Sequence, residues 1–269
     1  MKAQSILWQI SGVHDKASYL LGTVHIRSTF AFRAFPQFQN LISACDLYAG
    51  ESNLDDLGDF QLDGQFDPDY AARYQALLSE NQYAHLDRLI KKQVPQLKMW
   101  PYLHPMLLMS QIESALMGHD EAESLDLALW EFAKAEGKDL VGIESAALQR
   151  QIFNEMDLDA AFQNIKHTIA KMHSLRKNYK KIAHYYQNQD IHALYLKAKK
   201  QLGKMKRPML YDRNVYMADR IETLVQDQSV FVGIGVGHLP GEKGVLRLLK
   251  HKGFTLKPVQ IQAPNPQNI

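Results

Sequence analysis

The spacing of hydrophobic and polar residues along the chain predicts an α/β protein. Short apolar runs of strand length occur at residues 6–10, 19–24, 46–51, 139–144, 230–234 and 254–261. The segments between most of these runs are longer and carry apolar residues at helical spacing. The first two runs are separated by a short polar gap, which predicts a β-hairpin at the start of the chain.

The second half of the chain contains a long helical stretch. Residues 146–227 look wholly helical, and the part from 157 to 207 is basic and carries several tyrosines. We expect residues of about 155–207 to form a helical insert or cap in a single α/β domain of residues 1–262. A length of 269 residues fits one large domain or a core with an insert. Residues 263–269 are expected to be a flexible tail.

Composition narrows the class of protein. Hydrophobic residues make up 46% of the chain and charged residues 22%, as in soluble globular proteins. No run approaches the ~18 apolar residues of a membrane span, and the N-terminus lacks the features of a secretory signal. These features predict a cytoplasmic protein, or an exported one if the sequence is that of a mature form. The single cysteine, Cys45, excludes intrachain disulfides and is expected to be buried.

Charge is distributed unevenly. Residues 46–69 carry eight acidic residues and no Lys or Arg, whereas residues 166–207 carry twelve Lys or Arg and one acidic residue. Such asymmetry indicates a polyanion partner, attraction between two parts of one molecule, or a solvated helix surface. We favour the last two over nucleic-acid binding, because Lys and Tyr on a long helix more often form a solvated face and a packing face.

Four of the strand-like runs end on residues that can bind a metal or transfer a proton. His25 and His238 each end a Gly-x-x-His sequence, and Glu51 and Glu144 each end the frame Asp-Leu-x-x-x-Glu before a serine. In open α/β sheets, ligands bind beyond the carboxyl ends of the strands. These four side chains are therefore expected to share one site. The structural alternatives are tight strand-to-helix turns for the histidines and helix-capping regions for the glutamates.

The residue types indicate the chemistry of such a site. Neutral imidazole together with carboxylate suits manganese, iron, cobalt or zinc, and one glutamate can then act as general base for a metal-bound water. Arg213 can bind a substrate carboxylate or a developing oxyanion, or it can form a surface ion pair with Asp212 or Asp219. The chain has no Gly-x-Ser-x-Gly, His-Glu-x-x-His or phosphate-loop motif.

The same residues carry a resemblance to a known family. The matching segments are Leu7-Trp8-Gln9-Ile10, the run from Tyr19 to His25, Glu51, Gly142-Ile143-Glu144 with Gln149, Asp212-Arg213-Asn214 with Met217-Ala218, and the block from Gly235 to Gly253. Together they resemble the TraB/GumN family, which includes bacterial relatives of PrgY and the animal TIKI proteases. The resemblance spans residues of about 6–260, and the C-terminal block is its most specific part.

The resemblance implies a central mixed β-sheet flanked by helices, with a helical cap, of the erythromycin-esterase and ChaN-like type. TIKI proteins are metal-dependent proteases that favour manganese or cobalt, with two Gly-x-x-His motifs and a glutamate as the active site. The corresponding metal-binding residues here are His25, His238 and Glu51.

The resemblance makes Glu144 and Arg213 supporting members of the site, and we expect the following roles for them and for two further residues. Glu144 would be a base or a ligand, and Arg213 would stabilise negative charge. Arg27 and Asn214 are expected to bind the substrate, and Asp126 resembles a family position before the helix that leads to Glu144.

We therefore predict a metal-dependent hydrolase that acts on a peptide or small-molecule substrate, and we favour a peptidase. Its cofactor would be manganese, cobalt or zinc. Three alternatives remain open. One is a protein that sequesters a peptide or small ligand without turnover, as PrgY-like proteins restrain a peptide pheromone. The others are a haem or metal carrier of the ChaN-like kind and a nucleic-acid binder that uses residues 166–207.

Overall fold

A computed structural model describes residues 4–12, 16–24, 28–58, 65–95, 97–116 and 123–261. The strands are β1 (Leu7–Ser11), β2 (Ser18–Thr23), β3 (Leu47–Ser52), β4 (Asp139–Glu144), β5 (Val230–Gly235) and β6 (Thr255–Pro258). The α-helices are α1 (Thr29–Phe32), α2 (Phe35–Ala44), α3 (Pro68–Leu77), α4 (Glu80–Gln93), α5 (Pro105–Leu116), α6 (Leu125–Ala135), α7 (Ala146–Asn154), α8 (Leu158–Ala170), α9 (Met172–Gln187), α10 (Ile191–Leu202), α11 (Arg213–Asp227) and α12 (Val245–His251).

The described strands form one mixed sheet in the order β4-β3-β5-β2-β1-β6. Strands β4, β3, β5 and β2 are parallel to one another, whereas β1 is antiparallel to both β2 and β6. The predicted α/β fold with a mixed sheet and the predicted N-terminal hairpin are therefore confirmed. Because four neighbouring strands run the same way, their carboxyl ends meet at one edge of the sheet.

A row of glycines crosses the parallel part of the sheet. Gly50 of β3 pairs with Gly142 of β4 on one side and with Gly233 of β5 on the other. A Cβ at Gly50 would lie 3.2 Å from the Trp130 ring, and one at Gly233 would lie 3.0 Å from the Tyr48 hydroxyl. The glycines therefore let aromatic side chains approach the strands closely, just before the strands end.

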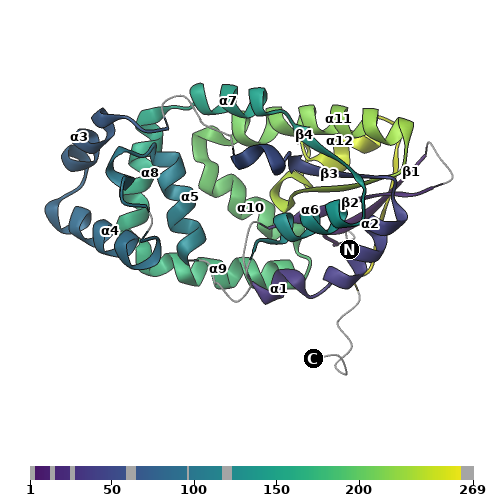
Figure 1. Ribbon diagram of the computed structural model, residues 1–269, viewed down its shortest axis with the longest axis horizontal. Coiled ribbons are helices and arrows are strands. Elements are labelled where there is room, and N and C mark those ends of the chain that lie inside the picture. Colours follow the sequence, from purple (N-terminus) through teal and green to yellow (C-terminus); the bar gives the residue numbers. More distant parts are fainter. Residues whose placement is uncertain are drawn as a thin grey trace. The chain divides into compact units, whose positions relative to one another are not determined.

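Helices cover both faces of this sheet (Figure 1). Helices α11 and α12 pack against each other and against the sheet, and α2 and α6 form a second layer on the opposite side. The central strands β2 and β5 are almost fully buried: Leu20, Leu21 and Phe231 have no exposed surface. Burial on both faces explains why β2 and β5 are continuous apolar runs rather than alternating ones. Cys45, at the end of α2, is buried as expected.

The chain divides into two compact units. The sheet unit comprises residues 1–59, 120–149 and 182–269, and the helical unit comprises residues 60–119 and 150–181. The predicted insert at 155–207 is thus shared between them. Its later part belongs to the sheet unit, where the Tyr186 hydroxyl donates to the Gly22 carbonyl at 2.9 Å.

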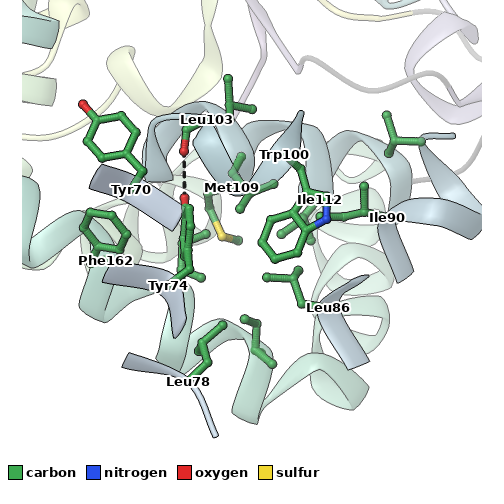
Figure 2. Close-up of a cluster of buried hydrophobic side chains, with 14 residues drawn as sticks. Tyr70, Tyr74, Leu78, Leu86, Ile90, Trp100, Leu103, Met109, Ile112 and Phe162 are labelled. Atoms are coloured by element: carbon green, nitrogen blue, oxygen red, sulfur yellow. Dashed lines mark hydrogen bonds between the residues drawn. The ribbon is translucent and has the colours of Figure 1, made fainter. Parts of the chain in front are cut away.

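The helical unit has a hydrophobic core of its own, built around aromatic side chains (Figure 2). Tyr74 is fully buried and its hydroxyl donates to the Leu103 carbonyl at 3.0 Å. The Tyr74 and Phe162 rings meet at 4.8 Å in an edge-to-face arrangement, a favoured geometry for aromatic pairs. At the surface of this unit, Ser79 and Gln82 form a reciprocal capping box that starts α4.

Two structural predictions concern the chain as a whole. No helix in the described ranges is long and apolar enough to cross a membrane. The predicted flexible tail, residues 263–269, lies outside the part of the chain that the structure describes.

Candidate active site

The parallel strands bring three distant segments of the sheet unit together. Glu51 lies near the end of β3, Glu144 ends β4 and Gly235 ends β5. The register pairs Ser52 directly with Glu144. The predicted meeting of strand-end residues at one edge is therefore seen for the described members. Helix α11 begins at the same place and contributes Arg213 as its first residue.

Arg213 bridges the two glutamates. Its Nε donates to Glu144 Oε1 at 2.6 Å, and its Nη2 donates to Glu144 Oε2 at 2.8 Å and to Glu51 Oε1 at 2.5 Å. Arginine presents donors in a planar fork that matches a carboxylate, so the contact with Glu144 is bidentate. Arg213 does not form the alternative surface ion pair with Asp212 or Asp219, because Asp212 pairs with Arg207 and Asp219 pairs with Lys252.

This ion cluster is largely shielded from water. The side chains of Arg213 and Glu51 are each 14% exposed, and that of Glu144 is 0% exposed. Burial raises the pKa of Glu144, although Arg213 partly opposes this shift. Burial works against a charged Arg213, yet the ion pairs with Glu51 and Glu144 raise its pKa above the usual value. Arg213 therefore stays positively charged and holds both carboxylates in fixed positions.

Glu51 also contacts the turn that leads to His238. Its Oε2 accepts a hydrogen bond from the Gly235 backbone N–H at 2.7 Å. A Cβ on Gly235 would lie 3.2 Å from Glu51 Oε2 and 3.4 Å from His238 Cδ2. The carboxylate oxygen and the imidazole carbon thus both approach the position that a side chain at residue 235 would occupy, and glycine leaves this position empty.

His238 is buried at the end of this turn and is held by Asn214. Its exposed fraction is 7%, and Asn214 is completely buried. His238 Nδ1 lies 2.6 Å from Asn214 Oδ1, while Asn214 Nδ2 donates to the Lys243 carbonyl at 2.7 Å. Asn214, which was expected to bind substrate, therefore has its amide oxygen and nitrogen engaged with the protein itself.

A cavity of ≈ 460 Å³ opens beside Glu51 in the sheet unit. Gly50 and Gly233 form part of its wall, together with the end of β3 and the N-terminal part of α6. The lining residues are Tyr48, Gly50, Glu51, Ser52, Leu54, Ser124, Asp126, Leu127, Trp130 and Gly233. Its size and its mixture of apolar walls with a few polar groups are typical of ligand sites.

Asp126 is a further carboxylate at this cavity. The Thr23 hydroxyl donates to Asp126 Oδ1 at 2.5 Å, which ties α6 to the end of β2. Burial, and after it the charge of Asp126, raises the pKa of both Tyr48 and Tyr186, so these phenols stay protonated. The family resemblance pointed to Asp126, whereas Tyr48 and Trp130 were missed. Gly50 and Gly233 make room for Trp130 and Tyr48 respectively, but the sequence alone does not identify which side chains fill this room.

Two predicted site residues, His25 and Arg27, lie outside the residues that the structure describes. Thr23, two positions before His25, pairs with Gly235 across β2 and β5. The backbone that leads to His25 is therefore described up to Val24, and the predictions for His25 and Arg27 remain predictions.

The fit of a divalent metal can be judged from the donors present. Within the described ranges, no group of three or more His, Cys, Asp or Glu side chains could hold a metal ion. Glu51 and His238 fit as two donors of a site that a residue such as His25 would complete, although a metal would share Glu51 with Arg213 and Gly235. Glu144 fits poorly as a ligand, because both of its oxygens bind Arg213 and its side chain is buried.

Comparison with known proteins identifies the family of the chain. No curated protein and no solved structure shows significant similarity to the chain. The family model described as the TraB/PrgY/gumN family matches residues 6–258, nearly the whole sequence. This range includes every element of the site described above. The chain therefore belongs to the TraB/PrgY/gumN family.

Proposed function

We propose that the chain is a hydrolase of peptides or small molecules, with the peptidase activity of TIKI-like relatives as the preferred assignment. One observation carries the proposal: Glu51 lines a cavity of ≈ 460 Å³ at the carboxyl ends of parallel strands, and Glu51 and His238 both approach the same point at Gly235. A carboxylate next to an imidazole, beside a cavity of ligand size, can orient a water molecule and accept its proton.

The described residues have different parts in this proposal. His238 accepts a proton or binds a metal, and Glu51 orients the attacking water. Arg213 provides a fixed positive charge that stabilises negative charge as it develops near Glu51. Glu144 keeps Arg213 in place, because its bidentate contact leaves the guanidinium little freedom. We thus assign Glu144 to the support of the site, although the sequence suggested a base or ligand.

A divalent metal remains part of the proposal. His238 and Glu51, together with His25, would hold manganese, cobalt or zinc. When bound, such a metal supplies a Lewis acid and lowers the pKa of a coordinated water. Hydrogen bonds to Asn214 and Arg213 hold the side chains of His238 and Glu51, so both are oriented before any ligand arrives.

The test is peptide hydrolysis by the purified protein with added manganese, cobalt or zinc and, in parallel, with a chelator. New amino termini are identified by mass spectrometry. We expect cleavage that depends on metal and falls by at least ~100-fold in His25→Ala, His238→Gln and Glu51→Gln. His251→Gln, at an exposed position of α12, is the matched control and should cleave normally. Cleavage that survives both chelator and His238→Gln would refute the assignment.

A second candidate, a protein that binds a peptide or small ligand without turnover, is favoured by a separate observation. Arg213 already neutralises part of the charge of Glu51 and Glu144, so the cluster could form one rigid side of a binding site without taking part in catalysis. This candidate predicts saturable binding of a ligand with no cleavage, and binding that survives Glu51→Gln. Saturable binding by both proteins, with no turnover by the wild-type protein with any of the three metals, decides in its favour.

A further inference from the structure

We propose that Asn214 is a positioning residue that fixes the tautomer of His238, so that the Nε2 lone pair is presented to the site. Whether the lone pair accepts a proton or binds a metal rests on the proposed function. The tautomer itself follows from hydrogen-bond geometry alone.

The orientation of the Asn214 amide is set by a backbone group. A carbonyl oxygen can only accept hydrogen bonds, so the Asn214 atom 2.7 Å from the Lys243 carbonyl must be the amide nitrogen. The amide oxygen is then the atom that faces His238 Nδ1 at 2.6 Å. The reversed amide would place oxygen against oxygen at Lys243 and is excluded on this ground.

The Lys243 carbonyl is itself held by a tight loop. A Cβ on the next residue, Gly244, would lie 2.2 Å from the Pro240 carbonyl oxygen, so only glycine fits there. The Gly244 N–H donates to the Gly241 carbonyl at 3.2 Å, and the Leu246 N–H donates to the Leu239 carbonyl at 3.1 Å. The loop therefore holds the Lys243 carbonyl in place, and this carbonyl orients the Asn214 amide.

The proton position on His238 follows from these contacts. An amide oxygen accepts but cannot donate, so Nδ1 of His238 must carry the hydrogen of the 2.6 Å bond. In a neutral imidazole, a protonated Nδ1 leaves the lone pair on Nε2. The Cδ2 atom, which is bonded to Nε2, is on the side of the ring that approaches Gly235. Nε2 lies across the ring from Nδ1, so its lone pair points away from Asn214.

Helix α11 couples this arrangement to the ion cluster. Arg213 and Asn214 are its first two residues, and they fix Glu51 and His238 respectively. Histidines that bind metals commonly donate their other ring N–H to an oxygen of the protein, and this partner orients the ring. Asn214 has that relation to His238, and its complete burial shields the hydrogen bond from competition by water.

The tautomer can be measured without any substrate or metal. We expect long-range ¹H–¹⁵N spectra of the metal-free protein, labelled at histidine, to show His238 with a protonated Nδ1 and an unprotonated Nε2. His238→Gln identifies the signal by its loss. Spectra are recorded at alkaline pH, where imidazole is neutral. An Nε2–H tautomer in the wild-type protein overturns the proposal, whether or not the protein hydrolyses peptides.

Variants of Asn214 separate positioning from simple stability. Asn214→Leu removes the acceptor and should shift His238 away from the Nδ1–H tautomer, whereas Asn214→Asp keeps an acceptor and should retain it. Ile221→Ala, in the buried face of the same helix, is the control for destabilisation and should leave the tautomer unchanged. Asn214→Leu with an unchanged Nδ1–H tautomer would contradict the proposed role.

Metal affinity gives a second readout. If zinc binds the wild-type protein in calorimetric titration, we expect Asn214→Leu to weaken its affinity by about 10- to 100-fold and Asn214→Asp to recover most of the loss. Equal zinc affinity in all three proteins would overturn the positioning role. Absence of zinc binding by the wild-type protein counts against the metal in the proposed function, and the tautomer spectrum then decides the role of Asn214 alone.

Discussion

Replacement of Arg213 by methionine tests the buried ion cluster at the centre of the site. The substitution keeps an unbranched apolar side chain on α11 but leaves Glu51 and Glu144 without their shared guanidinium. Removal of one partner from a buried ion pair costs about 3–5 kcal/mol, because the remaining charge is desolvated and uncompensated. We expect a loss of this size in the free energy of unfolding at about pH 7.5. The 0% exposure of Glu144 argues that water cannot replace the lost contacts.

The loss should depend on pH in a defined direction. The pKa of Glu144 is already raised by burial, and the variant loses the opposing influence of Arg213, so its pKa rises further. Between the pKa of the unfolded chain and this raised value, the folded state binds more protons than the unfolded state. Stability therefore falls as pH rises through that window. The destabilisation relative to wild type should thus shrink when the pH is lowered to about 5.

The assay is urea unfolding of both proteins at the two pH values, followed by far-UV circular dichroism. Arg220→Met, on the same helix, is the control and should change stability by less than about 0.5 kcal/mol. Adding Glu144→Gln to Arg213→Met removes the uncompensated charge and should recover at least about 1 kcal/mol. A loss below about 1 kcal/mol at neutral pH, or one that grows as the pH falls, would show that Arg213 is not a buried charge partner of Glu144.

Two further predictions concern the packing around the site and the core of the sheet unit. Gly235→Ala should lower hydrolysis, or ligand binding, by about 10- to 100-fold, because its Cβ would lie 3.2 Å from Glu51 Oε2 and force the carboxylate away from His238. Its φ of −52° suits alanine, so unchanged kinetics in a normally folded variant would contradict the close approach. Burial, and after it Asp46, raises the pKa of the Cys45 thiol to about 12, so a maleimide should label it only as fast as the protein unfolds. Labelling of folded protein at the rate of a free thiol would refute this expectation.

The strands and the N-terminal hairpin could be predicted from the sequence, because burial and connection length leave a clear pattern in it. The run at β5 is apolar throughout, as burial on both faces requires, and its shortness favours a strand. The polar gap after β1 is too short for a crossover, so the hairpin followed directly. The order of the strands could not be predicted, because the position of β5 between β3 and β2 depends on pairing across more than 170 residues.

The site was predicted in part. Parallel strands place their ends at one edge, so Glu51 and Glu144 were expected to meet, and they do so through Arg213. The role of Asn214 could not be predicted, since it depends on the distance from its amide to the Lys243 carbonyl, which sequence spacing does not determine. The cavity was missed for a similar reason. The pairing of Gly50 with Gly233 can be inferred only when the register of β3 and β5 is known.

The measurement that tests the central claim most directly is an experimental structure of the protein with manganese and a peptide. We expect the peptide to occupy the cavity beside Glu51, with Arg213 still bridging Glu51 and Glu144 and with His238 Nε2 directed at the metal or at the scissile bond. A peptide bound elsewhere, or an Arg213 side chain turned away from both glutamates, would contradict the assignment of this edge of the sheet as the active site.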